Sequence, residues 1–198
     1  MRYRTLRVIT PPTIEPVSLA EAKQHLRIEH DADDSLISAS ITAAREWTEV
    51  YLDSSLIATR WRVTLDMFPA EIVLPKSPLL SSPAPVVTYK TTNETTVTLS
   101  SSDYRVDAYA QPPAIRPNYA DSWPAHLADY NAVAVEFSVG YGTTADEVPQ
   151  RIKNALLMLT THLYEQRSAV LVGQGVVSKH IEVGVAALLD SARWGGYA

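Results

Sequence analysis

The distribution of glycine and proline divides this chain of 198 residues into three zones. All seven glycines lie at or after Gly140, and nine of the 13 prolines lie between Pro69 and Pro124. Proline interrupts helices and is tolerated in sheets only at edges or bulges, so the middle zone is expected to hold short strands and turns. The two outer zones show helical patterns instead.

The first zone, residues 18–56, predicts two helices. The segment PVSLAEAKQHLRI contains a capping box, with Glu21 three residues after Ser18. The segment HDADDSLISASITAAREWTEVYL opens with acids, which suit a helix N-terminus. Its apolar residues form two neighbouring stripes, Ile37, Ile41, Ala44 and Tyr51 beside Leu36, Ala43, Trp47 and Val50. So wide an apolar arc indicates packing against more than one neighbour, and the short link between the helices indicates a helical hairpin.

The second and third zones differ in their periodicity. Residues 57–144 hold short, often alternating runs rich in Val, Thr and Tyr, such as RWRVTLDMF, VVTYK and AVAVEFSV, which predict strands. The segment VPQRIKNALLMLTTHLYEQR has apolar residues at helical spacing, and VGVAALLDSARW predicts a last short helix.

We therefore predict an α+β fold in which N- and C-terminal helices form one bundle or layer and a β-rich insertion lies between them. The expected organisation is an N-terminal arm (1–17), a helical domain (18–56 and 145–194), the β-rich insertion (57–144) and a flexible tail (195–198).

The stretch FSVGYGTTADEVP has the order of a phosphate-binding loop: a strand, two glycines and a helix start. It lacks the lysine of that motif, and Asp146 and Glu147 stand where a phosphate would dock. We interpret Gly140, Gly142 and Pro149 as a structural joint that returns the chain from the strands to the helix.

Motifs with catalytic or metal-binding chemistry are absent from the sequence. The chain has no cysteine, which excludes disulfides, thiolate nucleophiles and Cys-based zinc sites. No two of its five histidines stand four residues apart, and there is no G-x-S-x-G. The run DADDSLISASIT lacks the glycine and glutamate of a calcium loop. We predict no catalytic residue, cofactor or metal, and thus no enzyme.

The net charge and the hydropathy of the chain indicate which partners and which location to expect. The net charge is −5, and no segment approaches the roughly 20 apolar residues of a membrane span, so we expect no membrane partner and a cytoplasm, or a particle assembled there, as the location. Arg2, Arg4 and Arg7 form either a solvated arm or a contact to nucleic acid or an acidic partner. Trp194 and Tyr197, on a glycine-rich end, either anchor an interface or fold back onto the helices.

The ordered set EPVSLAEAKQHLRIEHDADDSLISASITAAREWTEVY, YRVD, VEFSVGYG, VPQRIKNALLMLTTHLYEQR and GVAALLDSARW resembles the head–tail connector, or adaptor, proteins of long-tailed phages and phage-like gene transfer agents. The likeness runs from about Glu15 to Trp194. It implies a structural protein of the phage neck that binds the portal, forms a dodecameric ring and continues the DNA channel toward the tail.

The resemblance also implies partners and sites. The partners are the portal protein, neighbouring copies in the ring, a tail-side stopper or terminator protein, and DNA that passes through the lumen without specific binding. The expected location of the protein is the neck of a virion or phage-like particle that is assembled in the bacterial host cytoplasm. The candidate portal-docking residues are Leu188, Leu189, Arg193, Trp194 and Tyr197.

A ring of identical subunits needs two different faces on each subunit, because each copy contacts the next through one face and the previous one through the other. The candidate subunit-interface residues are Leu36, Trp47, Val50 and Tyr164. Two alternatives remain: another neck or tail-completion protein, and, from a different class, a small-ligand or nucleotide-binding enzyme subunit.

Overall fold

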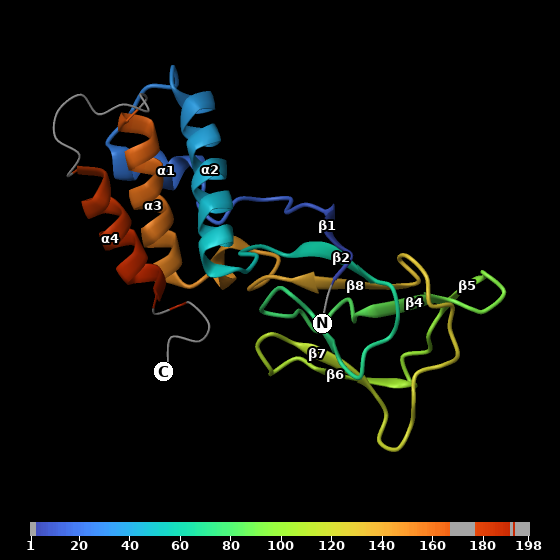
Figure 1. The fold of residues 1–198 in the computed structure, drawn as a ribbon. Coiled ribbons are helices and arrows are strands. Elements are labelled where there is room, and N and C mark those ends of the chain that lie inside the picture. The colour runs from blue at the N-terminus through green and yellow to red at the C-terminus, as the bar shows by residue number, and fades with distance from the viewer. Residues whose placement is uncertain (1–2, 167–176, 191, 193–198) are drawn as a thin grey trace. The chain divides into compact units, whose positions relative to one another are not determined.

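The computed structural model describes residues 3–166, 177–190 and 192 (Figure 1), and for residues 177–183 it describes the backbone only. Within these residues it has four α-helices and two antiparallel sheets, so the predicted α+β class is confirmed. The chain divides into two compact units. The β unit comprises Met1–Pro12 and Ala58–Gly142, and the helical unit comprises Thr13–Ile57 and Thr143–Ala198.

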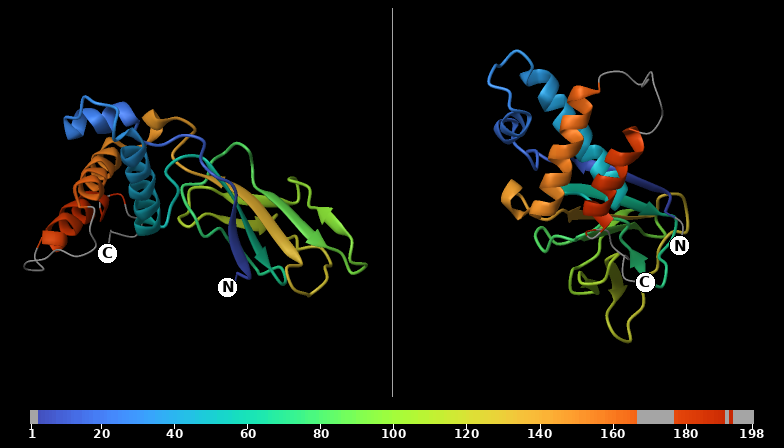
Figure 2. Two further views of the ribbon diagram at one scale, coloured as in Figure 1. Left: turned by 90° about the horizontal axis from the view of Figure 1, so that it is seen from above. Right: turned by 90° about the vertical axis from the view of Figure 1, so that its left-hand side faces the viewer.

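The helical unit contains α1 (Leu19–Leu26), α2 (Asp34–Leu52), α3 (Gln150–Glu165) and α4 (Val177–Asp190). Helix α3 is central, because it contacts each of the other three (Figure 2). Its buried residues include Ile152, Ala155, Leu156 and Leu159, the stripe expected from the sequence. They pack with buried side chains of the other helices, including Ala22, Ile37, Ile41, Ala44, Val185 and Leu189.

Local signals explain where α1 and α2 begin and end. The Ser18 hydroxyl oxygen accepts a hydrogen bond from the Glu21 backbone N–H (3.2 Å), and the Ser18 N–H donates to the Glu21 carboxylate (2.7 Å), as the capping box predicts. Arg27 caps the C-terminus of α1 and Asp53 that of α2, both in the left-handed conformation with φ of 57° and 51°. This conformation lets the cap N–H groups reach the last helical carbonyls.

The β unit is built from two sheets, one above the other in Figure 1. The larger has the order β1 (Thr5–Thr10), β2 (Thr59–Leu65), β8 (Val133–Val139), β4 (Val86–Lys90) and β5 (Thr96–Thr98). The smaller has the order β3 (Ile72–Val73), β7 (Ala114–Pro117) and β6 (Tyr104–Asp107). One core cluster takes side chains from both sheets, among them Val63, Ile72, Val87, Ile115 and Phe137. The opposite face of the larger sheet therefore points away from this core.

The N-terminal segment differs from the single arm of residues 1–17 that the sequence indicates. Thr5–Thr10 is an edge strand, paired antiparallel with β2. Leu6 and Val8 alternate with Thr5 and Arg7, but the run is short and every residue of the strand is exposed, so no buried face marks it in the sequence. Its β-branched residues and the free edge of β2 explain the pairing. Glu15 and Val17 belong instead to the helical unit, where Val17 is buried.

No helix among the described residues combines the length and the hydropathy needed to cross a membrane.

Candidate assembly surfaces

Gly140 and Gly142 lie at the end of β8, where the chain leaves the β unit. Gly140 has φ of 145°, and its N–H donates to the Pro78 carbonyl oxygen (3.0 Å). The Gly142 carbonyl oxygen accepts from the Ala58 N–H (2.8 Å). Because φ at Gly140 lies in a region that residues with a Cβ rarely adopt, glycine is required there by the backbone.

Gly140→Ala is expected to lower the free energy of unfolding by about 1–3 kcal/mol, because the alanine Cβ strains this backbone conformation. Urea denaturation of the purified chain measures the change. Gly142→Ala is the matched control, because Gly142 does not have a positive φ. Equal stability of Gly140→Ala and the wild type would mean that the turn tolerates a side chain.

The two acidic side chains of the segment after Gly142, Asp146 and Glu147, are each held by nearby groups of the chain. The Thr144 N–H and hydroxyl both donate to Glu147 (2.9 Å each), and these hydrogen bonds, the backbone one foremost, hold the pKa of Glu147 below its usual value. Asp146 lies 3.7 Å from the Lys153 ammonium, and Pro149 immediately precedes α3. The two acids thus lie in a short 3-10 turn (Ala145–Glu147) just before α3, whose own first turn has no acidic residue, and their charge repels a phosphate group from this segment.

The outer face of α2 exposes large apolar side chains. Val50 is 79% exposed and Trp47 is 39% exposed. The Trp47 ring stacks on Tyr51 with centroids 5.2 Å apart, and the Tyr51 hydroxyl donates to Asp190 of α4 (2.6 Å). Trp47 is therefore held in position while its other face is open, which is the state expected of an interface anchor.

The other two predicted interface residues are placed differently. Leu36 is half-buried in the first turn of α2. Tyr164 is half-buried on α3, and its hydroxyl donates to Asp33 (2.5 Å), within the helical unit. The structure therefore brings Trp47 and Val50 together on one exposed helix face, and gives Tyr164 a contact between α3 and the start of α2.

The predicted portal-docking residues fall in and after α4. Helix α4 begins at Val177, six residues before Val183, where the sequence pattern predicts its start. Leu188 is half-buried, whereas Leu189 is buried and serves the core of the helical unit. Arg193, Trp194 and Tyr197 lie outside the described residues.

A partly buried ion-pair network around Arg45 could not be predicted from the sequence. The Arg45 guanidinium donates to Glu15 (2.8 Å) and to Glu49 (2.9 Å), and Glu49 also accepts from the Leu56 N–H (2.9 Å). Burial raises the pKa of Glu49, against the opposing influence of the Leu56 N–H and Arg45. The i, i+4 spacing of Arg45 and Glu49 is a local signal, but Glu15 lies too far away in the chain for any spacing rule.

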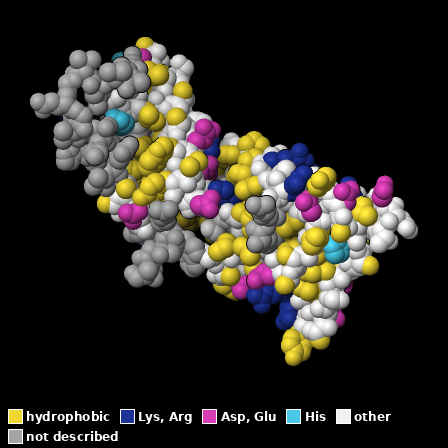
Figure 3. Space-filling view, viewed as in Figure 1, with side chains coloured by type: hydrophobic (Ala, Val, Ile, Leu, Met, Phe, Trp, Pro, Cys, Tyr) yellow, Lys and Arg dark blue, Asp and Glu magenta, His cyan; other side chains and the backbone are white. Residues whose placement is uncertain are grey.

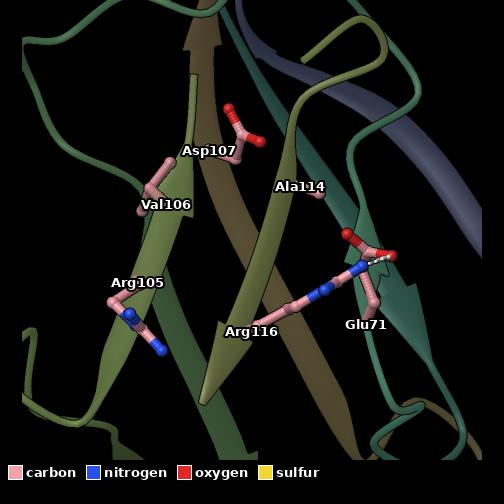
Figure 4. A pocket seen from close by; sticks show the side chains of 6 residues that line it. All are labelled: Glu71, Arg105, Val106, Asp107, Ala114 and Arg116. Atoms are coloured by element: carbon pink, nitrogen blue, oxygen red, sulfur yellow. Dashed lines mark hydrogen bonds and ion pairs between the residues drawn. The ribbon is translucent and has the colours of Figure 1, made fainter. Parts of the chain in front are cut away.

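An open hollow of about 410 Å³ lies over β3, β6 and β7 (Figure 4). It is lined by Glu71, Arg105, Val106, Asp107, Ala114 and Arg116. Arg116 reaches across to Glu71 (2.8 Å), and Asp107 accepts from two N–H groups of the following turn. The hollow lacks the enclosed, apolar lining of a small-molecule site. Among the described residues, no three His, Cys, Asp or Glu side chains are grouped to hold a metal ion.

Comparison with known proteins relates part of the chain to a family. The family model of phage gp6-like head-tail connector proteins matches residues 16–109. No curated protein matches the chain.

Solved structures with the same fold come from gene transfer agent (GTA) particles. A chain in the neck of an empty GTA particle, computed with C6 symmetry, is 20% identical with a TM-score of 0.76, over 96% of this chain and 95% of that one. A chain in the virion of a native GTA particle gives the same values. A chain in the neck of a native GTA particle, computed with C12 symmetry, is 19% identical with a TM-score of 0.70, over 94% of each chain. The resemblance to head–tail connector proteins is therefore confirmed, by the family model over residues 16–109 and by a fold shared with GTA neck and virion chains over nearly the whole length.

Proposed function

We propose that this chain is a structural, non-enzymatic head–tail connector that forms a ring, docks on the portal vertex and continues the DNA channel to the tail. The observation that carries the proposal is the match of residues 16–109 to the connector family, together with a shared fold over 96% of the chain. In this proposal the helices from both chain ends form one layer, and the β unit is an insertion into it.

The exposed face of α2 supports the ring. Trp47 and Val50 present apolar area that no other part of the described chain covers, and Trp is common among residues that anchor interfaces. Leu36 would extend this contact, and Tyr164 would stabilise it from within through Asp33. By analogy with the C12 neck, we propose twelve copies. Twelve chains of net charge −5 would form an acidic ring that lets DNA pass without holding it.

The C-terminal segment is the proposed portal contact. Leu188, Arg193, Trp194 and Tyr197 would meet the portal, while buried Leu189 would hold α4 to the helical unit. A tail-side stopper or terminator protein would bind the opposite end of the ring. The assembly would take place in the bacterial host cytoplasm, and the finished ring would lie in the neck of a virion or phage-like particle.

Light scattering of the purified chain, alone and mixed with the portal protein of the same genome, tests the proposal. We expect a large complex with the portal, visible as a ring by electron microscopy. Deleting residues 194–198 is expected to weaken portal binding and leave the circular dichroism spectrum unchanged. A small species that ignores the portal, and whose melting temperature rises with millimolar nucleotide, would instead indicate a ligand-binding protein.

A further inference from the structure

The outward face of the larger sheet carries a row of arginines. Residues directly opposite each other on paired strands share a face, and Arg7 of β1 opposes Arg62 of β2, which opposes Glu136 of β8. Arg60 stands two residues before Arg62 and therefore lies on the same face. The side chains of Arg60 and Arg62 are 34% and 35% exposed. Lys and Arg side chains gather on the upper side of the β unit in Figure 3.

This basic face, defined as Arg7, Arg60 and Arg62, has too few carboxylates for its charge. Glu136 accepts from Arg60 (2.8 Å) and from Arg62 (3.0 Å), and these contacts, with the Arg62 hydrogen bond foremost, hold the pKa of Glu136 below its usual value. Within the part of the chain that the structure describes, Arg7 forms no ion pair. Like charges directly opposite each other destabilise a sheet, so the row favours an added anion.

The helical unit has the opposite charge balance. Its two segments, residues 13–57 and 143–198, hold 14 acidic and 8 basic residues, a net charge of −6. The β unit holds 8 acidic and 9 basic residues, a net charge of +1. On α2 the only basic residue, Arg45, is buried, whereas Glu46 is 68% exposed beside Trp47 and Val50. The outer face of α2, defined as Glu46, Trp47 and Val50, is thus apolar and acidic.

We propose that the basic face of one copy receives the outer face of α2 of the next copy. The inference rests on the proposed ring and names the surface that meets α2. A heterologous ring requires two different, complementary faces on each subunit, and these two faces differ in charge in the required way. The arginine stems and guanidinium planes can cover Trp47, while Glu46 supplies the missing anion.

The apolar contacts and the charged contacts contribute differently to this interface. One exposed ion pair contributes little to affinity, so the buried area of Trp47 and Val50 has to supply most of it. The charges instead select the partner face, because like charges brought together across an interface cost several kcal/mol. Charge reversal is therefore a sharper probe than charge removal.

The test uses two reversals, Arg7→Glu and Glu46→Arg, in the full chain. Both positions are exposed, but Glu46 also lies 3.8 Å from the Arg45 guanidinium, so the circular dichroism spectrum and melting temperature of each variant are compared with those of the wild type. Sedimentation of each variant alone, with the portal as template if the wild type requires it, is expected to show self-association weakened by about tenfold or more. An equimolar mixture is expected to assemble again, because in an alternating ring each reversed face meets the other reversed face and each original face meets the other original face. The double variant is expected to assemble by itself.

Cross-linking checks the contact directly, because the chain has no cysteine of its own. Chains with Arg7→Cys and Glu46→Cys are mixed and treated with a short bis-maleimide, and we expect the 7–46 heterodimer to dominate. Arg105→Cys is the matched control, since Arg105 is an exposed arginine of the smaller sheet. Equal cross-linking of positions 105 and 7 to position 46 would overturn the inference.

The remaining outcomes separate this inference from the proposed function. Wild-type-like ring formation by each single-reversal variant on its own would overturn the paired faces and leave the connector function standing. Loss of duplex DNA binding by Arg7→Glu, with assembly intact, would assign the basic face to DNA and overturn the inference. A wild-type chain that never self-associates, with or without portal, would overturn both proposals.

Discussion

Replacing Leu156 with aspartate is expected to unfold the helical unit at 25 °C. Leu156 is 1% exposed and lies on α3, the helix that contacts α1, α2 and α4. A carboxylate there would have to be buried without a partner or protonated, and losses above about 4 kcal/mol are typical of such substitutions. Since whole domains are stable by only about 5–15 kcal/mol, most of the margin disappears. Far-UV circular dichroism and thermal melting measure the loss of helix.

Leu163→Asp is the matched control for this experiment. It is the same substitution on the same helix, but Leu163 is 38% exposed, so its charge remains in water and the melting temperature should change little. If Leu156→Asp melts like Leu163→Asp, the inner face of α3 does not form the core of the helical unit.

Replacing Arg45 with methionine is expected to lower the free energy of unfolding by about 3 kcal/mol at pH 7. Its guanidinium side chain is only 9% exposed and bridges Glu15 and Glu49. Methionine retains much of the volume but leaves two neighbouring carboxylates without their cation, and breaking a buried ion pair on one side costs about 3–5 kcal/mol. Urea denaturation provides the measurement.

The pH dependence identifies the cause of this loss. Arg45 lowers the pKa of Glu49, so its removal lets burial raise that pKa further. A carboxyl whose folded pKa lies above its unfolded value destabilises the fold as pH rises through the folded value. The deficit of Arg45→Met should therefore shrink on acidification as Glu49 becomes protonated. Adding Glu49→Gln, which keeps an acceptor for the Leu56 N–H, should recover part of the loss at pH 7. A deficit that is the same at pH 4 and pH 7 would point to packing instead of charge.

Much of the local structure could be predicted from the sequence. Ser18 and Glu21 are three residues apart, and the stripe of Ile152, Ala155, Leu156 and Leu159 repeats within one helix. The alternation in AVAVEFSV predicts β8 for the same reason. These signals are carried by residues close in the chain, so propensity, capping and periodicity are sufficient to find them.

The candidate surfaces were predictable only in part. The exposed pair Trp47 and Val50 follows from the second apolar stripe of α2, because a stripe beyond the one buried against α3 has no core to join. The hydroxyl of Tyr164 is instead held by Asp33, and Leu189 of the predicted docking set is buried. A helical stripe shows which residues share a face, but the number of neighbouring helices decides how many of them remain exposed.

By itself, then, the sequence determined the helices, most of the strands, the joint at Gly140 and the connector resemblance. Only the tertiary structure decided that Thr5–Thr10 pairs with β2, that Glu15 meets Arg45, and that Arg7, Arg62 and Glu136 form one row. The physical reason is that strand order and register depend on the summed free energy of pairing and burial between distant segments. This sum is not visible as a periodic pattern in any single segment of the sequence. It places the excess of positive charge on the outer face of the larger sheet.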